Sequence, residues 1–534
     1  MKRTLSLFVL LMLFFMPSSF AEIRGAELIP ADSWIYDALR YLSVDTGQTT
    51  LAVNSPASVN EFRIYLGAIP YESLGVQGQN LYRKIQDSLG STEPLWTSGL
   101  ASLDFNPVVS VTGRSTLDEN AYFGFESIEN YNETAPLLSV PLRLGFTPFV
   151  SAFADFSLGE GYWASLINGN YSNIPVSADD IDLNVPSRAY LSCGTDFFTA
   201  VVGRGSPQIS RTLNDSMILS GTQDRTNYSS FVFFSPAIRL SITPVELAND
   251  RWVYFHDLTI RPLPNLTLCF SEAASVNSTI DVRYLNPAMI FHSYAGWRDD
   301  YGQADGYSPV GTQFALSADF VPAPGYRIYG QFVMNQFQTS YELETYSSTA
   351  GAIPNSLGGL AGIEAIRPFR NGYLTGSIEG VYSNPWLYML SNHDISFYWY
   401  RRELMAPSGY ASKKIEGWLG SPYGPDTIAC LARAVYDVPQ SHTMGFEYRF
   451  IYKGDNETDF LESSADDYYP DTLTEAARGN PTGTHRTQNS LSLFGMVRID
   501  SHLVIDGKLG YSLMDDGQLT PSVNARCSMT WSLR

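Results

Sequence analysis

The chain has 534 residues, of which 54 are acidic and 34 are basic, and its formal net charge is −20. This acidity excludes a nucleic-acid-binding protein, since such a protein needs a basic face to neutralise phosphates. Four cysteines are too few for a disulfide-dense or zinc-ribbon scaffold. Hydrophobic residues make up 44% but charged residues only 16%, against about 25% in ordinary soluble proteins. This balance favours one large all-β body with an apolar outer surface over several soluble domains.

Residues 1–21 predict a secretory signal peptide. Lys2 and Arg3 form a basic start, residues 5–16 are apolar, and Ser19 and Ala21 supply the small residues that a signal peptidase needs. About a dozen apolar residues are too few to span a bilayer, which disfavours the alternative of an uncleaved anchor helix. Cleavage after Ala21 removes both basic residues and leaves 32 basic and 54 acidic residues, a net charge of −22.

Residues 22–96 predict a short helical N-terminal domain or plug on the periplasmic side. The first expected helix covers residues 33–42 and the third covers residues 79–89, where Gly90 ends it. Between them, Ser58 and Glu61 have the spacing of a capping box before a helical segment at residues 62–66.

Residues 97–534 predict a transmembrane antiparallel β-barrel. Apolar and polar residues alternate over segments such as 444–453, 503–513 and 522–533. Each is about ten residues long, the length of a tilted transmembrane strand. Successive side chains of a strand point to opposite faces, so one face is oily and the other carries charges, as a water-filled lumen permits. The charged residues on that face include Arg143, Arg327, Glu447, Arg449, Asp506 and Lys508.

At roughly 24 residues per strand and connection, this length predicts about 18 strands. The chain also ends on an alternating strand with Trp531 and Leu533 on its oily face, as expected if the last strand closes a barrel. Many outer-membrane chains end on an aromatic residue, whereas this one ends on Arg534. A soluble all-β protein with half-buried strands remains the alternative.

No catalytic or metal-binding motif stands out, and the sequence predicts no cofactor and no enzyme activity. The six histidines are well separated, and neither a metal-binding His pair nor a nucleophile elbow or P-loop occurs. Two adjacent polar pairs, His393-Asp394 and Ser271-Glu272, are expected to face lumen or loop water. Cys527 shares the oily face of its strand, so we expect it to behave as a small hydrophobic residue.

The expected loops are rich in aromatic and acidic residues. Tyrosine and tryptophan present flat apolar faces with polar tips, which suit the stacking of sugars, although barrels also place aromatic girdles at both membrane interfaces. Residues 455–471 hold seven acidic residues and no basic one, but their spacing fits no calcium-binding loop, so a solvated surface loop is expected. The loop aromatics are Tyr122, Tyr131, Tyr162, Trp163, Tyr171, Tyr301, Tyr307, Tyr468 and Tyr469.

Short motifs follow one another along the chain from residue 203 onward. They are Gly203-Arg204, Thr212 to Ser220, Ser271-Glu272-Ala273, Arg283 to Pro287, Tyr329-Gly330-Gln331 with Gln336-Phe337, Glu379 through Pro385 to Tyr388, and Leu419-Gly420 with Gly424-Pro425-Asp426. Their order resembles that of the Wzi family of outer-membrane capsule-assembly proteins. The expected first helix also resembles the opening of that family, whereas Asn335 stands where the family usually has an acidic residue.

The resemblance implies a barrel of about eighteen strands with a small helical element on the periplasmic side. It also implies a lectin-like role in retaining capsular or other surface polysaccharide, without catalysis. No sugar-contacting residue can be carried over, because the loops do not align. An acidic polysaccharide would be repelled by so acidic a chain unless cations or local basic patches intervene.

The sequence therefore predicts a non-enzymatic outer-membrane barrel that binds or assembles surface polysaccharide at the cell exterior. A porin or solute channel is the alternative, and a barrel enzyme acting on lipid or glycan is a third possibility. The expected partners are surface polysaccharide, outer-membrane lipid and the barrel-assembly machinery, with no nucleic acid.

Overall fold

The structure is a computed structural model. It describes residues 24–90, 94–98, 101–117, 135–147, 149–160, 170–175, 181–182, 186–223, 225–292, 310–337, 339, 341, 354–390, 393–405, 411–456, 479 and 481–533. The predicted signal peptide and its cleavage site lie outside the described residues. Within these ranges, no helix is both long enough and apolar enough to cross a membrane.

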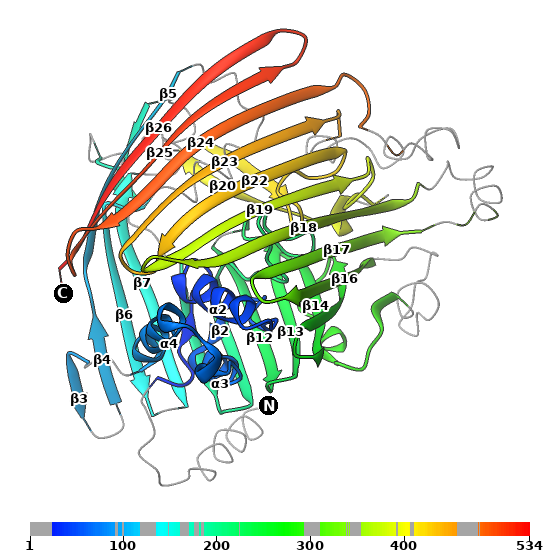
Figure 1. The fold of residues 1–534 in the computed structure, drawn as a ribbon. Coiled ribbons are helices and arrows are strands. Elements are labelled where there is room, and N and C mark those ends of the chain that lie inside the picture. The colour runs from blue at the N-terminus through cyan, green and yellow to red at the C-terminus, as the bar shows by residue number, and fades with distance from the viewer. Residues whose placement is uncertain are drawn as a thin grey trace.

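Within the described residues, 18 antiparallel strands form a closed barrel, as the sequence predicted (Figure 1). Each strand pairs with the next, and the last strand, β26, pairs with β5 to close the circle. The strands are β5 (Val108–Leu117), β6 (Leu138–Phe146), β7 (Val150–Glu160), β10 (Ala189–Gly194), β11 (Phe198–Gly205), β12 (Thr226–Phe234), β13 (Ile238–Ala248), β14 (Arg251–Leu263), β15 (Leu266–Val276), β16 (Val310–Ala323), β17 (Tyr326–Gln336), β18 (Ser356–Phe369), β19 (Gly372–Ser383), β22 (Thr427–Val438), β23 (His442–Lys453), β24 (Arg486–Arg498), β25 (Leu503–Asp515) and β26 (Leu519–Ser532).

Short strands complete the barrel near the closing pair. The strands β3 (Trp96–Ser98) and β4 (Ala101–Phe105) precede β5, and β4 pairs with β6 while β5 pairs mainly with β26. Further along β5, its other edge pairs with β8 (Asn170–Ser172). The remaining short strands are β1 (Leu28–Ile29), β2 (Ala57–Ser58), β9 (Ile181–Asp182), β20 (Tyr398–Met405) and β21 (Ala411–Trp418).

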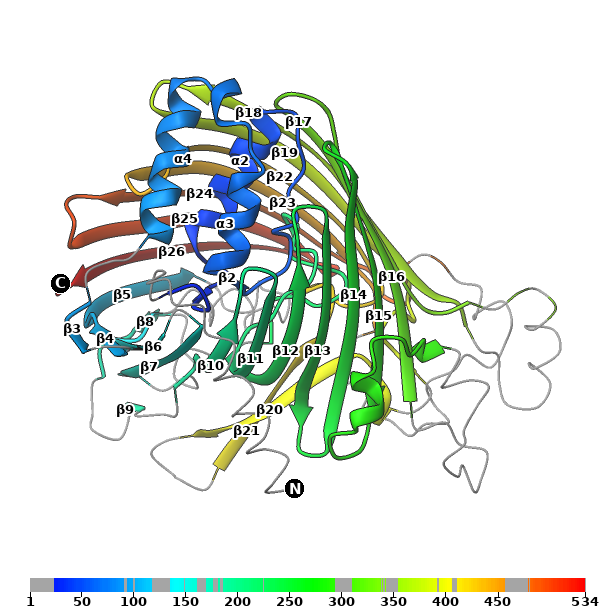
Figure 2. The same cartoon turned by 90° about the horizontal axis from the view of Figure 1, so that it is seen from below.

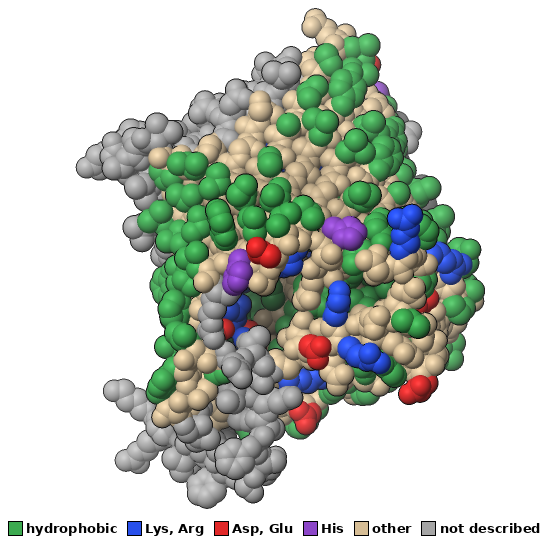
Figure 3. Space-filling view, turned by 60° about the vertical axis from the view of Figure 1, so that its left-hand side comes forward, with side chains coloured by type: hydrophobic (Ala, Val, Ile, Leu, Met, Phe, Trp, Pro, Cys, Tyr) green, Lys and Arg blue, Asp and Glu red, His purple; other side chains and the backbone are tan. Residues whose placement is uncertain are grey.

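The outer wall of the barrel is apolar, as alternation predicted. On neighbouring strands, Met444, Leu493 and Leu509 are 60%, 57% and 54% exposed, although water would disfavour such large apolar side chains. Their sequence neighbours Ser492 and Gly510 face the lumen and are buried. Figure 3 shows a broad apolar zone on this wall. A wall of this kind fits a lipid environment.

The two ends of the barrel differ in their connections. At one end, called here the short-turn end, every connection is short; an example is the turn between β16 and β17, where Gly325 has φ +81°. The long connections all lie at the opposite end, called the loop end. In outer-membrane barrels the short turns face the periplasm and the long loops face the outside.

Three helices lie at the short-turn end, inside the curve of the sheet (Figures 1 and 2). They are α2 (Trp34–Asp45), α3 (Val59–Gly67) and α4 (Val76–Leu89). The Ser58 hydroxyl caps α3 by accepting from the Glu61 N–H at 3.2 Å, and Gly90 follows α4, as the sequence predicted. The apolar faces of the helices pack on one another and on buried residues of the wall, namely Val321, Ile366 and Tyr373.

Candidate functional site

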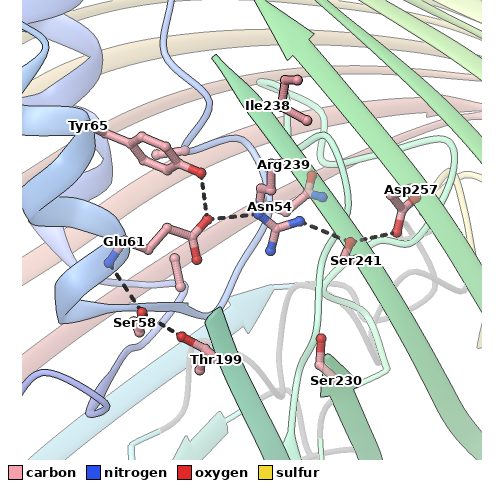
Figure 4. A network of polar contacts seen from close by, with 12 residues as sticks. Asn54, Ser58, Glu61, Tyr65, Thr199, Ser230, Ile238, Arg239, Ser241 and Asp257 are labelled. Atoms are coloured by element: carbon pink, nitrogen blue, oxygen red, sulfur yellow. Dashed lines mark hydrogen bonds and ion pairs between the residues drawn. The ribbon is translucent and has the colours of Figure 1, made fainter. Parts of the chain in front are cut away.

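The helical element is anchored to the lumenal wall by a buried ion pair. Arg239 on β13 donates from Nε to the Glu61 carboxylate at 2.8 Å, and the two side chains are 4% and 1% exposed (Figure 4). The Tyr65 hydroxyl also donates to Glu61 at 2.9 Å, and burial raises the pKa of Tyr65 well above its usual value. On the other side, Arg239 donates to Ser241 at 3.0 Å, and Ser241 donates to Asp257 at 3.2 Å.

A second group of ion pairs anchors α2. Arg40 of α2 lies 3.1 Å from Glu364 on β18. Glu364 also lies 3.3 Å from Arg327 on β17, which pairs with Asp319 on β16 at 2.7 Å. These contacts attach the helix to three adjacent strands, so the helical element is a fixed part of the lumen at the short-turn end.

The lumen is also filled from the loop end. Residues 206–223, between β11 and β12 and called here the first inward loop, fold into the barrel, where Met217, Ile218 and Leu219 are almost completely buried. The Glu379 carboxylate on β19 holds this loop by accepting from the backbone N–H groups of Leu213 and Asn214 at 3.1 and 2.9 Å. A carboxylate that accepts backbone N–H groups forms strong, charge-assisted hydrogen bonds.

The described parts of residues 384–426, called the second inward loop, pack on the first. The Tyr388 hydroxyl donates to the Met217 carbonyl at 2.8 Å and accepts from the Ser421 N–H at 2.9 Å. The Ser220 N–H donates to the Leu419 carbonyl at 2.7 Å. Both loops join one apolar core with the lumenal wall. Along β11 to β19, the loop end is therefore filled by interlocked segments that lie about 200 residues apart in the sequence.

Part of the second inward loop is a hairpin formed by β20 and β21. At its base, Arg251 of β14 lies over the Tyr398 ring, 4.0 Å from the ring centroid. Arg251 also donates to the backbone carbonyls of Asp394 and Ser396, and Trp399 and Trp418 at the base are buried. These contacts hold the base of the hairpin on the loop end.

Packing is uneven around the lumen. From β11 to β19 the wall side chains are covered by the helices and the inward loops, and cavities of about 20 and 30 Å³ remain, enough for one or two waters. A cavity of about 40 Å³ lies near β6 and β10, lined in part by Arg24, Glu27 and Arg143. On the opposite wall, charged lumenal side chains such as Arg526 and Asp506 are 22% and 26% exposed. Water therefore reaches this second sector.

The adjacent pair Ser271 and Glu272 points to opposite faces of β15. Ser271 donates a hydrogen bond to Asp257 inside the lumen. Glu272 faces outward, where its carboxylate accepts from the N–H groups of Phe291 and His292 at 2.9 and 3.1 Å. The two side chains therefore cannot act together. The expectation that Glu272 faces lumen or loop water is wrong, because residues 277–292 fold over it on the outer wall.

The other sequence candidates also lie in structural positions. The His393 ring and the Asp394 carboxylate lie 3.1 Å apart in a short 3-10 helix (His393–Ile395), and both side chains are exposed. His256 is buried beneath residues 277–292, with Nε2 2.9 Å from the Tyr284 carbonyl. Cys527 is exposed on the outer wall, as predicted. In the described part of the chain, no three His, Cys, Asp or Glu side chains lie close enough together to hold a metal ion.

The aromatic residues expected in the loops lie outside the described residues, except Tyr171, which belongs to β8. The acidic segment 457–471 also lies outside them. The sequence analysis did not predict the inward loops. The apolar run Met217-Ile218-Leu219, which shows no alternation within a polar segment, was the available signal for a buried loop.

No family model and no curated protein matches this chain. Among solved structures, Wzi of Escherichia coli, described as an outer-membrane protein involved in group 1 capsule assembly and as a carbohydrate-binding β-barrel, has a TM-score of 0.59 and 13% identity, over 95% of this chain and 99% of that chain. Pseudomonas aeruginosa OprD has a TM-score of 0.41 and 9% identity over 81% and 95%, and OccK5 of the same organism has 0.41 and 10% over 82% and 100%. The resemblance to the Wzi family, seen first in the order of short motifs, is thus confirmed as a shared outer-membrane barrel fold.

Proposed function

We propose that this protein is a non-enzymatic outer-membrane barrel that binds or helps to assemble surface polysaccharide at the cell exterior. The observation that carries the proposal is that the two inward loops pack on each other and on the wall, and fill the loop end along β11 to β19. A barrel whose outward end is partly filled by fixed loops suits a binding platform better than a wide pore. The fold shared with Wzi, a carbohydrate-binding barrel, supports this choice.

The described chemistry favours binding over catalysis. The Ser271 and Glu272 side chains lie on opposite faces, His256 is buried, and the His393 ring lies against Asp394. In this proposal the outer wall contacts outer-membrane lipid, the barrel-assembly machinery inserts the chain, and an N-terminal signal, cleaved after Ala21, exports it.

The test combines a gene deletion with a binding measurement. Cells that lack the protein should release surface polysaccharide into the medium, and re-expression of the wild-type chain should restore its retention. The purified full-length protein in detergent should bind the isolated polysaccharide of the same strain. Normal retention in the deletion strain, together with no binding by the purified protein, would exclude the proposal.

A solute channel is the second candidate, and the water-accessible sector of the lumen along β22 to β26 favours it. Planar-bilayer recordings separate the two functions, because a channel conducts ions in the wild-type state. Closed bilayers at every applied voltage would exclude the channel and leave the binding platform.

A further inference from the structure

One junction in the described wall of the barrel, between β5 and β6, is paired over only a short stretch. The two strands have 10 and 9 residues, but they are register partners only where Val108 meets Ser139 and Val109 meets Leu138. The next shortest pairings, of β7 with β10 and of β12 with β13, each join five residue pairs. The edge of β5 beyond Val109, residues 110–115, has no strand partner in β6 and is called here the seam.

Two prolines account for this junction. Pro107 follows Asn106 between β4 and β5, and the chain changes neighbours there: β4 pairs with β6, whereas β5 runs beside β26 (Figure 1). Pro141 lies within β6, and its carbonyl accepts from the Asn106 N–H at 3.4 Å. Since the N–H and C=O of one strand residue point toward the same neighbour, the N–H that Pro141 lacks would have pointed to this side. Proline is therefore suited to a strand edge or a break in a sheet.

Residues 170–174, called here the seal segment, cover the seam. They include β8, which pairs with residues 113–115, and Asn173. The Asn173 side chain accepts from the Thr112 N–H at 2.9 Å. It also donates to the carbonyls of Ser110 and Ala135 at 2.7 and 2.8 Å. Asn173 is 1% exposed, so one buried side chain takes the place of a partner strand along this part of β5.

The two sides of the seam differ in polarity. On the lumenal side, Ser110 and Thr112 form hydrogen bonds with hydroxyl groups of β26, the strand on which Arg526 is 22% exposed to water. On the outer wall, Val111 of β5 and Phe156 of β7 are 42% and 50% exposed. The seal segment therefore separates a water-accessible part of the lumen from an apolar outer surface, and it does so by hydrogen bonds alone.

The chemistry of the strand edge limits what could replace the seal segment. If this segment left β5, the backbone groups of Ser110 and Thr112 would lose their partners, which is costly next to lipid. Sugar hydroxyl groups both donate and accept hydrogen bonds, so a glycan could satisfy these groups, while an acyl chain could lie against Val111 and Phe156. A ligand that binds only the open state shifts the equilibrium toward it. The seam thus suits a molecule with a sugar end and an apolar end.

We propose that the seam is a lateral opening of the barrel that binds a lipid-linked glycan, with the sugars in the lumen and the acyl chains in the bilayer. The seal segment leaves β5 while the ligand is bound. The proposal rests on the proposed polysaccharide-binding function and names the class of ligand, a glycan that carries a lipid anchor. It also gives such a glycan a path into the lumen from the membrane, although the inward loops fill the loop end along β11 to β19.

The test locks the seam with a disulfide. Gly113 and Ser172 are register partners on β5 and β8, and register partners in antiparallel strands have Cα atoms about 4.5–5.5 Å apart, which suits a disulfide. A Cβ added at Gly113 meets open space. The variant is Gly113→Cys/Ser172→Cys in a full-length chain whose native cysteines are replaced by alanine. The control is Gly507→Cys in a chain that keeps only Cys527, its register partner on the fully paired strands β25 and β26.

The probes are smooth lipopolysaccharide, which carries acyl chains, and the lipid-free polysaccharide prepared from it. Each protein is incubated with lipopolysaccharide in vesicles and then purified in mild detergent, and the lipopolysaccharide that remains bound is measured. Locking the seam before incubation should reduce this amount at least tenfold relative to the reduced protein. Calorimetry with the lipid-free polysaccharide should give the same affinity in both states. Conversely, lipopolysaccharide added first should slow disulfide formation at least fivefold. The control pair should show neither effect.

Loosening the seal should act in the opposite direction. Asn173→Ala removes the hydrogen bonds to Ser110, Thr112 and Ala135 and should speed the loading of lipopolysaccharide at least threefold. The control Asn227→Ala, at an exposed contact with Glu246, should load like the wild type. Heat-modifiable migration in gels checks the folding of every variant. If Gly113→Cys/Ser172→Cys does not fold, Val109→Cys/Leu138→Cys locks β5 to β6 at their register partners and should give the same result.

Three results would overturn the lateral opening: equal binding of lipopolysaccharide by the locked and reduced proteins, equal effects of the seam pair and the control pair, or disulfide formation that lipopolysaccharide does not slow. Any of these results, with the lipid-free polysaccharide still bound, would leave the proposed function standing. Failure of the wild-type protein to bind either probe or the polysaccharide of its own strain would remove both.

Discussion

Glu61 on helix α3 and Arg239 on strand β13 form an ion pair at 2.8 Å that is almost completely shielded from water. The pair joins the N-terminal helical element to the wall of a barrel whose first strand, β5, begins only at Val108. The Glu61 carboxylate therefore holds the helical element in place, and its removal would leave the Arg239 guanidinium buried without a compensating charge.

The variant Glu61→Ala should destabilise the contact between helix and wall by about 3–5 kcal/mol, because it leaves the Arg239 guanidinium buried without its carboxylate. We expect faster proteolysis within residues 24–90 and a lower thermal midpoint in detergent. Asp37→Asn, which removes the 59% exposed partner of Arg40, is the control and should cost about 0–1 kcal/mol. Equal effects of the two variants would contradict the role of the buried pair.

The variant Glu379→Gln should loosen the first inward loop. The carboxylate accepts two backbone N–H groups and the Thr212 hydroxyl, and hydrogen bonds to a charged group contribute about 1.5–3 kcal/mol each. Trypsin should then cleave after Arg211 faster than in the wild type, and bilayers should show more frequent openings. The control Glu246→Gln, at an exposed contact with Asn227, should change neither the cleavage rate nor the openings. A Glu379→Gln variant that trypsin cleaves after Arg211 no faster than the wild type would show that Glu379 does not hold the loop.

The barrel and the helices followed from local sequence patterns. Alternation over residues 503–513 identified both the lipid-facing Leu509 and the lumen-facing Lys508, since strand side chains alternate between faces. The capping box of Ser58 and Glu61 located the start of α3. Each of these patterns spans no more than about a dozen residues, so it can be recognised in a single segment of the sequence.

The contacts that fill the interior of the lumen could not be predicted from the sequence. The contact of Tyr388 with Met217 joins residues 171 positions apart, and no local pattern specifies which distant segment a loop will meet. The neighbours of Arg526 could not be predicted either, because they depend on the register of three strands, two of which are the first and last of the barrel. Alternation did contain one unused signal: adjacent residues such as Ser271 and Glu272 must face opposite sides.

The stability of the first inward loop should depend on pH through Asp215. Burial raises the pKa of its carboxyl group, although the Gly221 N–H donates to it at 2.9 Å. A raised pKa in the folded state means that folding favours the protonated form. The stabilising contribution is therefore complete below about pH 4, the pKa of an unfolded aspartate, and is lost as the pH rises through the raised value.

Asp215→Asn should remove this dependence, and asparagine tolerates the residue's φ of +73°. Amide hydrogen exchange of residues 206–223, compared with β16 in the same protein, is the measurement. Protection in the wild type should decrease from pH 4 to pH 7 relative to the variant, after correction for intrinsic exchange. A wild-type profile parallel to that of the variant would show that Asp215 titrates as an ordinary aspartate.

A charged side chain near the middle of the outer wall should destabilise the barrel. Leu493→Arg places a guanidinium on a 57% exposed, outward-facing position of β24, which costs about 2–4 kcal/mol at the bilayer midplane. Urea unfolding in lipid vesicles measures the loss. The control Leu493→Met keeps the size and polarity of the side chain and should cost less than about 1.5 kcal/mol. An unchanged free energy of unfolding in Leu493→Arg would mean that this position lies outside the hydrocarbon layer.

Lys508→Gln should stabilise the barrel. Lys508 lies directly opposite Arg526, and relief of a like-charge pair on neighbouring strands contributes about 0.2–1 kcal/mol. The thermal midpoint in detergent should therefore rise at low ionic strength, and the gain should shrink at 1 M salt, where the screening length falls to about 3 Å. Asp506→Asn should act in the opposite direction, since it removes the carboxylate that lies 3.0 Å from Arg526. A lower midpoint for Lys508→Gln at every salt concentration would contradict the prediction and would mean that this lysine stabilises the barrel through its other contacts.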